Sequence, residues 1–123
     1  MFGKDEKQEV LREGINRARK QLELNPNDRR ALSLGSGDLF EIGEREEAFE
    51  WINNALKLYP EDAGVLFNGV CLYAKDGNKE KALDLLELAV EKGFGKRDWI
   101  EHDPDYDSLR DEPRFQALLS RLK

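Results

Sequence analysis

The chain has 123 residues, enough for one domain with a modest core and too few for two domains of ordinary size. Hydrophobic residues make up 39% and charged residues 37% of the sequence, against an average charged share of about 25%, which argues against a large buried catalytic domain. The net charge of −6 disfavours nucleic acid and anionic membranes as partners, because both repel an acidic surface.

The sequence predicts a cytoplasmic protein. The longest uncharged run, residues 63–74, is shorter than the roughly 18 residues that a membrane span needs. The chain opens on a charged segment and not on a signal peptide. Cys71 is the sole cysteine, which rules out an internal disulfide and a cysteine-based metal cluster. We expect no cofactor and no metal.

The composition predicts an all-α fold, since 18 Leu and 9 Ala outweigh 8 Val plus Ile and no Thr is present. Residues 5–24 are the first predicted helix, and its following segment, residues 24–28, matches residues 58–62. We therefore interpret this helix as the second half of an incomplete unit. Its buried stripe is expected at Val10, Leu11, Ile15, Ala18 and Leu22.

A period of 34 residues follows, because residues 29–62 align with residues 63–96. The identical pairs are Leu32/Leu66, Gly35/Gly69, Gly43/Gly77, Glu46/Glu80, Ala48/Ala82 and Ala55/Ala89. Gly43 and Gly77 are predicted to end the first helix of each unit, since glycine adopts the left-handed conformation without a Cβ clash. A second helix with an apolar stripe then follows, and acids after it suit the start of the next helix.

The tail, residues 97–123, is predicted to cover the end of this array. Pro104 should interrupt a helix that begins near Lys96, and Pro113 suits the first turn of a last helix. We expect Trp51 and Trp99 to be core or cap residues. The apolar face of the last helix consists of Phe115, Leu118, Leu119 and Leu122.

The pattern resembles the tetratricopeptide repeat. Counted from Arg29, the repeat over residues 29–62 has the Ala, Ala and Pro of the motif at Ala48, Ala55 and Pro60. The resemblance implies a right-handed superhelical array of antiparallel helix hairpins, an α-solenoid. The implied organisation of the single domain, residues 1–123, is a partial repeat over 5–28, repeats over 29–62 and 63–96, and a C-terminal capping segment over 97–123. Residues 91–123 resemble the segment that ends such arrays in bacterial multidomain signalling proteins.

The resemblance also implies a concave groove, lined by the first helix of each unit, that binds a peptide or a protein surface. Transferred by position, the groove residues are Arg30, Ser33, Gly37, Phe40, Glu41, Gly64, Phe67, Asn68, Cys71, Ala74 and Lys75. The family's clamp for a carboxylate terminus is not expected, because Ser33 and Gly37 stand where its Lys and Asn belong. An apolar or short helical ligand against Phe40 and Phe67 fits better.

Catalytic residues are not expected, because the chain has one His, one Cys and no Thr. His102 is interpreted as a residue of a capping turn. The acids between 103 and 107 are interpreted as helix caps, since Ser108 stands at the glycine of a calcium loop. Cys71 is expected to be a small buried hydrophobe. Gly35-Ser36-Gly37 indicates close helix packing and not a phosphate loop.

These observations predict a non-enzymatic interaction scaffold, with a docking or regulatory role in a larger protein. The alternative is a module that self-associates through residues 10–22, where the incomplete first unit leaves an apolar face without a partner helix. A small hydrolase or metal enzyme built on His102 is the least favoured interpretation.

Overall fold

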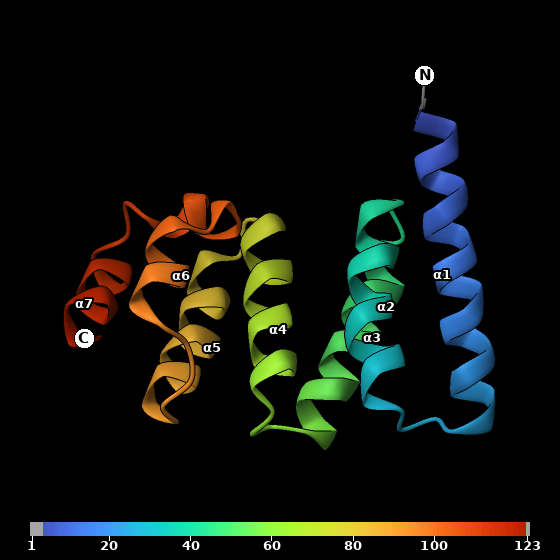
Figure 1. The fold of residues 1–123 in the computed structure, drawn as a ribbon, viewed down its shortest axis with the longest axis horizontal. Helices are drawn as coiled ribbons and strands as arrows, with labels where there is room; N and C mark the ends of the chain where they lie inside the picture. The colour runs from blue at the N-terminus through green and yellow to red at the C-terminus, as the bar shows by residue number, and fades with distance from the viewer. Residues whose placement is uncertain (1–3, 123) are drawn as a thin grey trace. The chain divides into compact units, whose positions relative to one another are not determined.

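The computed structural model describes residues 4–122, which form helices joined by short turns and include no β-strand (Figure 1). This confirms the predicted all-α class and shows packed helix pairs. In chain order the elements are α1 (Lys4–Leu24), α2 (Arg29–Glu41), α3 (Arg45–Leu58), α4 (Ala63–Lys75), α5 (Lys79–Glu91), α6 (Arg97–His102), the 3-10 helix η1 (Pro104–Leu109) and α7 (Pro113–Arg121).

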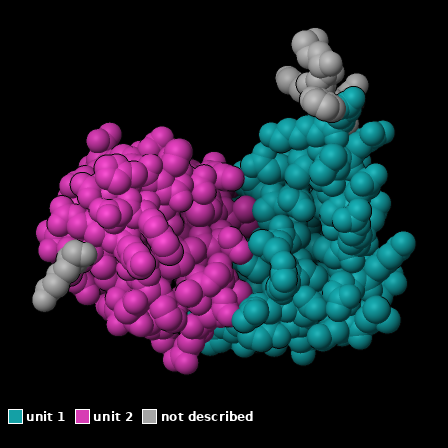
Figure 2. All heavy atoms as spheres, viewed as in Figure 1, with its two compact units in different colours: residues 1–60 teal, residues 61–123 magenta. Residues whose placement is uncertain are grey.

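The chain forms two compact units (Figure 2). The first unit, residues 1–60, holds α1, α2 and α3, and the second unit, residues 61–123, holds the remaining helices. Among the described helices, none has both the length and the apolar character needed to cross a membrane.

Local sequence signals place the helix boundaries. Asp28 caps α2 by accepting a hydrogen bond from the amide of Ala31 at 2.9 Å, and Asp62 caps α4 by accepting one from Val65 at 3.0 Å. Gly43 and Gly77 follow α2 and α4 with φ of +91° and +84°. Both predicted helix stops are confirmed, because this backbone conformation strongly favours glycine.

In the first unit, α2 lies against α3 and α1 lies against α2. Gly35 makes the close approach possible, since a Cβ there would lie 2.5 Å from a ring carbon of Trp51. Gly35 therefore confirms the predicted close packing, and Trp51 is a core residue, as expected.

The predicted apolar face of α1 is only partly correct. Ile15 is buried at 1% exposure, while Leu11, Ala18 and Leu22 are half-buried. Val10 is 68% exposed, so its predicted burial is wrong. Helix α2 packs against α1, so the face of residues 10–22 has a partner helix along part of its length.

In the second unit, α4 packs on α5 and η1, and α7 closes against α5. Phe115 is fully buried, and Leu118 and Leu119 are also buried. Arg114 joins α7 to α5, because its guanidinium contacts Asp84 Oδ1 at 2.8 Å and Glu87 Oε2 at 3.1 Å. The predicted apolar face of the last helix is thus confirmed for Phe115, Leu118 and Leu119, whereas Leu122 follows the end of α7 and is half-buried.

Candidate functional site

A pocket of about 300 Å³ lies within the second unit, between α4 and the segment formed by α6 and η1. We call it the α4–α6 pocket. Half of its lining residues are aromatic or aliphatic. The full lining consists of Phe67, Asn68, Cys71, Gly95, Trp99, Ile100, Asp103 and Tyr106. Its volume lies at the lower end of the range of about 300–1,000 Å³ that is typical of small-ligand sites.

Gly95 shapes the rim of the pocket. Its φ is +88°, and a Cβ at this position would lie 2.9 Å from Cζ of Phe67 and 3.1 Å from Cδ1 of Ile100. Any side chain would therefore be both strained in its backbone and in collision with the Phe67 ring. Glycine lets the turn before α6 pass directly over Phe67.

Arg110 holds the corner between α6 and η1. Its guanidinium donates hydrogen bonds to the backbone carbonyl oxygens of Glu101 and Asp103. Its Nε also lies 2.8 Å from Asp107 Oδ1. The Asp103 carboxylate accepts a hydrogen bond from the Asp105 amide at 2.9 Å, which confirms the predicted capping role of that acid. This corner carries Trp99 and Tyr106 into the pocket wall.

Cys71 and Tyr106 form a neutral part of the lining. The Cys71 thiol donates to Asp105 Oδ2 at 3.6 Å. Burial, together with the nearby Asp105 carboxylate, raises the pKa of the Cys71 thiol to about 12. Burial likewise raises the pKa of the Tyr106 phenol. Cys71 is half-buried at the pocket, so the prediction of a small buried hydrophobe is only partly correct. A protonated thiol is also a poor nucleophile at neutral pH.

Three of the predicted groove residues, Phe67, Asn68 and Cys71, line the α4–α6 pocket. Lys75, also on α4, is exposed and lies outside the lining. Gly64 is exposed at the start of α4, and Ala74 is buried near its end.

The predicted residues of the first unit are placed differently. Ser33 is buried at 5% exposure. The Phe40 ring packs edge-on against Phe49 of α3, with ring centroids 6.1 Å apart. Arg30 and Glu41 are exposed, and Gly37 has open space where a Cβ would lie.

The prediction that Trp99 is a core or cap residue is wrong. Trp99 is 65% exposed, lines the pocket, and has Lys96 Nζ 5.3 Å from its ring centroid. The short helix α6 buries Ile100 instead. The sequence signal that was missed is the length of α6, because six residues between a glycine turn and Pro104 can bury only one narrow face.

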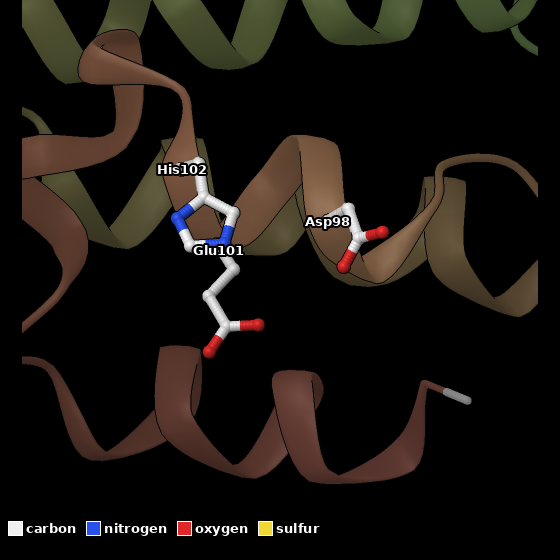
Figure 3. Close-up of side chains that lie close together, drawn as sticks. All are labelled: Asp98, Glu101 and His102. Atoms are coloured by element: carbon white, nitrogen blue, oxygen red, sulfur yellow. The ribbon is translucent and has the colours of Figure 1, made fainter.

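Asp98, Glu101 and His102 lie on α6, and one potential ligand atom of each lies within 4.8 Å of the others (Figure 3). Carboxylate and imidazole groups can bind a divalent cation. Glu101 is already paired, since Oε2 lies 3.4 Å from Nε of Arg97. Asp98 and His102 are exposed. His102 is the last residue of the helix α6, whereas the sequence predicted it in a capping turn.

A smaller pocket of about 140 Å³ lies in the first unit, bordered by Arg12, Ile15, Asn16, Arg19, Ile42 and Glu44. Arg19 is held by Glu47, whose Oε1 lies 3.2 Å from Nε of the arginine. The charged border and the smaller volume make this pocket less suited to an apolar ligand than the α4–α6 pocket.

No protein-family profile matches the chain. It is 28% identical over its full length to the interferon-induced protein with tetratricopeptide repeats 3 of Mus musculus, covering 28% of that protein. It is also 35% identical over 83 residues, 65% of the chain, to a chloroplastic protein of Arabidopsis thaliana, covering 25% of it. The chain thus spans about a quarter of the length of these curated relatives. The similarity and the packed helix pairs together fit a protein that resembles the tetratricopeptide-repeat class.

Proposed function

We propose that the chain is a non-enzymatic protein-interaction module, whose second unit binds an apolar segment of a peptide or protein at the α4–α6 pocket. The α4–α6 pocket is the observation that carries this proposal. It gathers Phe67, Trp99 and Tyr106 around a concave surface, and large aromatic side chains are enriched at protein interfaces. The similarity to a protein with tetratricopeptide repeats supports the same role.

The proposal includes a place in a larger assembly. Because the chain covers only about a quarter of each curated relative, a docking or regulatory role beside other segments is consistent with the comparisons. We expect the helix hairpins to wind right-handedly, as the family resemblance implies. A bacterial source and a cytoplasmic location stay predictions from the sequence, as does the absence of nucleic-acid and membrane partners.

Affinity capture of a binding partner tests this function, with the intact chain and two variants of it immobilised separately. The intact chain is compared with Phe67→Ala, which removes one pocket wall, and with Phe40→Ala, which removes an aromatic ring of equal size from the first unit. All three must show the same helical circular dichroism. We expect a partner that the intact chain and Phe40→Ala retain and that Phe67→Ala loses. A partner retained equally by all three would contradict the proposed site.

The second candidate function is self-association through α1. It rests on Val10 and Leu24, which are 68% and 83% exposed. Sedimentation over a hundredfold range of concentration tests it, beside the double variant Val10→Ser/Leu24→Ser. A mass that rises with concentration in the intact chain, but not in the double variant, would support this function. A constant monomer mass of the intact chain would contradict it.

A further inference from the structure

The α4–α6 pocket has room for one large apolar side chain. A cavity of about 150 Å³ accommodates a benzene ring in a protein core. At about 300 Å³, the pocket can therefore hold a phenylalanine, leucine, methionine or tryptophan side chain of a partner. The aromatic walls Phe67, Trp99 and Tyr106 provide the apolar contact for such an anchor.

The segment around the pocket is strongly acidic. Residues 97–112 contain seven acidic and two basic residues, so their net charge is −5. The two basic residues are already engaged, because Arg97 pairs with Glu101 and Arg110 pairs with Asp107. The cations Lys96 and Lys75 also lie near the pocket, the first over Trp99 and the second near Cys71.

Two carboxylates of this segment lie at or beside the pocket. Asp103 is part of its lining, and Asp105 lies 3.6 Å from the thiol of Cys71, which is also part of the lining. Among the described residues, neither carboxylate forms an ion pair with a basic side chain. An occupant with an acidic residue beside its anchor would therefore be repelled, whereas a Lys or Arg there would be attracted.

We propose that the α4–α6 pocket selects a basic peptide segment: one large apolar anchor side chain enters the pocket, and a neighbouring Lys or Arg pairs with Asp103 and Asp105. This inference rests on the proposed function, because it specifies the partner of the same pocket. The apolar anchor supplies affinity, and the charged pair supplies specificity.

Selection from a random library of 12-residue peptides displayed on phage tests the inference. The library is applied to the intact chain and counter-selected on Trp99→Ala, which removes a pocket wall. Because Trp99 is largely exposed, we expect this variant to keep its fold. The enriched peptides should share a large apolar residue with Lys or Arg within about one helical turn of it.

The enriched peptide is then synthesised and its affinity is measured by fluorescence anisotropy. We expect Asp103→Asn/Asp105→Asn to weaken binding about fivefold, because exposed ion pairs contribute modestly. The matched control Glu50→Gln/Glu91→Gln removes two exposed charges elsewhere and should leave the affinity unchanged. Higher salt should lower the affinity for the intact chain more than for the Asn variant.

The outcomes separate the two proposals. Enriched peptides that need Trp99 but carry no basic residue would contradict the selection of a basic segment. Equal binding to the Asp103→Asn/Asp105→Asn variant would contradict it as well. Both results would still support the α4–α6 pocket as the binding site. A library from which no peptide remains after the counter-selection on Trp99→Ala overturns both.

Discussion

Individual small residues decide how closely helices approach each other in this chain. Gly35 on α2 lies directly under the Trp51 ring of α3, while Gly37, two residues further along, faces open space. The two glycines share a helix and a residue type, so their surroundings alone distinguish them. They offer a matched pair of substitutions.

Gly35→Ala should lower the free energy of unfolding by about 2 kcal/mol, because the new Cβ forces the Trp51 ring out of its position. Gly37→Ala should raise it by up to about 1 kcal/mol, because alanine favours a helix and meets no obstacle. Urea unfolding followed by circular dichroism measures both values. Equal effects of the two substitutions would contradict the described packing of α2 on α3.

The Cys71 thiol should react slowly with iodoacetamide below pH 9. Its pKa of about 12 means that the reaction rate should continue to rise above pH 9, where an ordinary thiol with pKa 9.0 levels off. The raised pKa also means that the protein loses stability as the pH rises. The contribution of the protonated thiol to the free energy of unfolding is fully present below about pH 9, and it is lost as the pH approaches 12. A rate that levels off near pH 9 would contradict the burial of this group.

Element boundaries follow from local chemistry. The caps Asp28 and Asp62 stand one repeat apart, and each accepts a hydrogen bond from the amide three residues later. Asn78 does the same for α5, accepting from the amide of Lys81 at 3.2 Å. These interactions depend only on neighbouring residues, so sequence reasoning could find the acidic caps before α2 and α4.

Asp62→Ala should lower the free energy of unfolding by about 1 kcal/mol, because the Val65 amide loses its acceptor at the start of α4. Asp62→Asn is the control, since an asparagine oxygen can accept the same hydrogen bond. Thermal unfolding monitored by circular dichroism compares the two variants. An equal loss in Asp62→Asn would show that the cap does not contribute through this bond.

Arg110→Met should destabilise the second unit by about 2 kcal/mol, because two backbone carbonyls at the corner of α6 and η1 lose a charged donor. Methionine retains much of the apolar stem. Arg97→Met is the comparison, since Arg97 forms an exposed pair within α6 and should cost less than about 1 kcal/mol. Amide hydrogen exchange should show faster exchange around α6 in the first variant alone. Unchanged exchange there would contradict the role of Arg110 at this corner.

The helices of the repeat could be predicted because glycine stops, acidic caps and 3.6-residue stripes are local or periodic signals. The environment of Trp99, Phe40 and Val10 could not, since it depends on which element lies opposite each side chain. The aromatic ring of Phe40 contacts Phe49 of α3, a contact within a hairpin that repeat positions do not encode. Part of the pocket lining could be predicted, because Phe67, Asn68 and Cys71 follow from repeat positions. Trp99 and Tyr106 come from the non-repetitive tail, and Gly95 comes from the turn that precedes it.

At the scale of the whole molecule, the segment that follows α5 builds one side of the α4–α6 pocket. This segment turns over Phe67 at Gly95, Arg110 holds its corner through hydrogen bonds to backbone carbonyls, and its aromatic side chains form a wall opposite α4. The exposed face of a repeat helix thereby gains a bounded, acidic-edged pocket. Our central proposal is that the chain recognises its partner at this pocket in the second unit.

Amide chemical-shift mapping of the isotopically labelled chain, titrated with the peptide selected from the library, tests that proposal most directly. We predict that the largest shifts occur at Phe67, Cys71, Trp99 and their neighbours on α4, α6 and η1, and that the residues of α1 are unaffected. Shifts concentrated in α1 to α3, with none around the α4–α6 pocket, would contradict it.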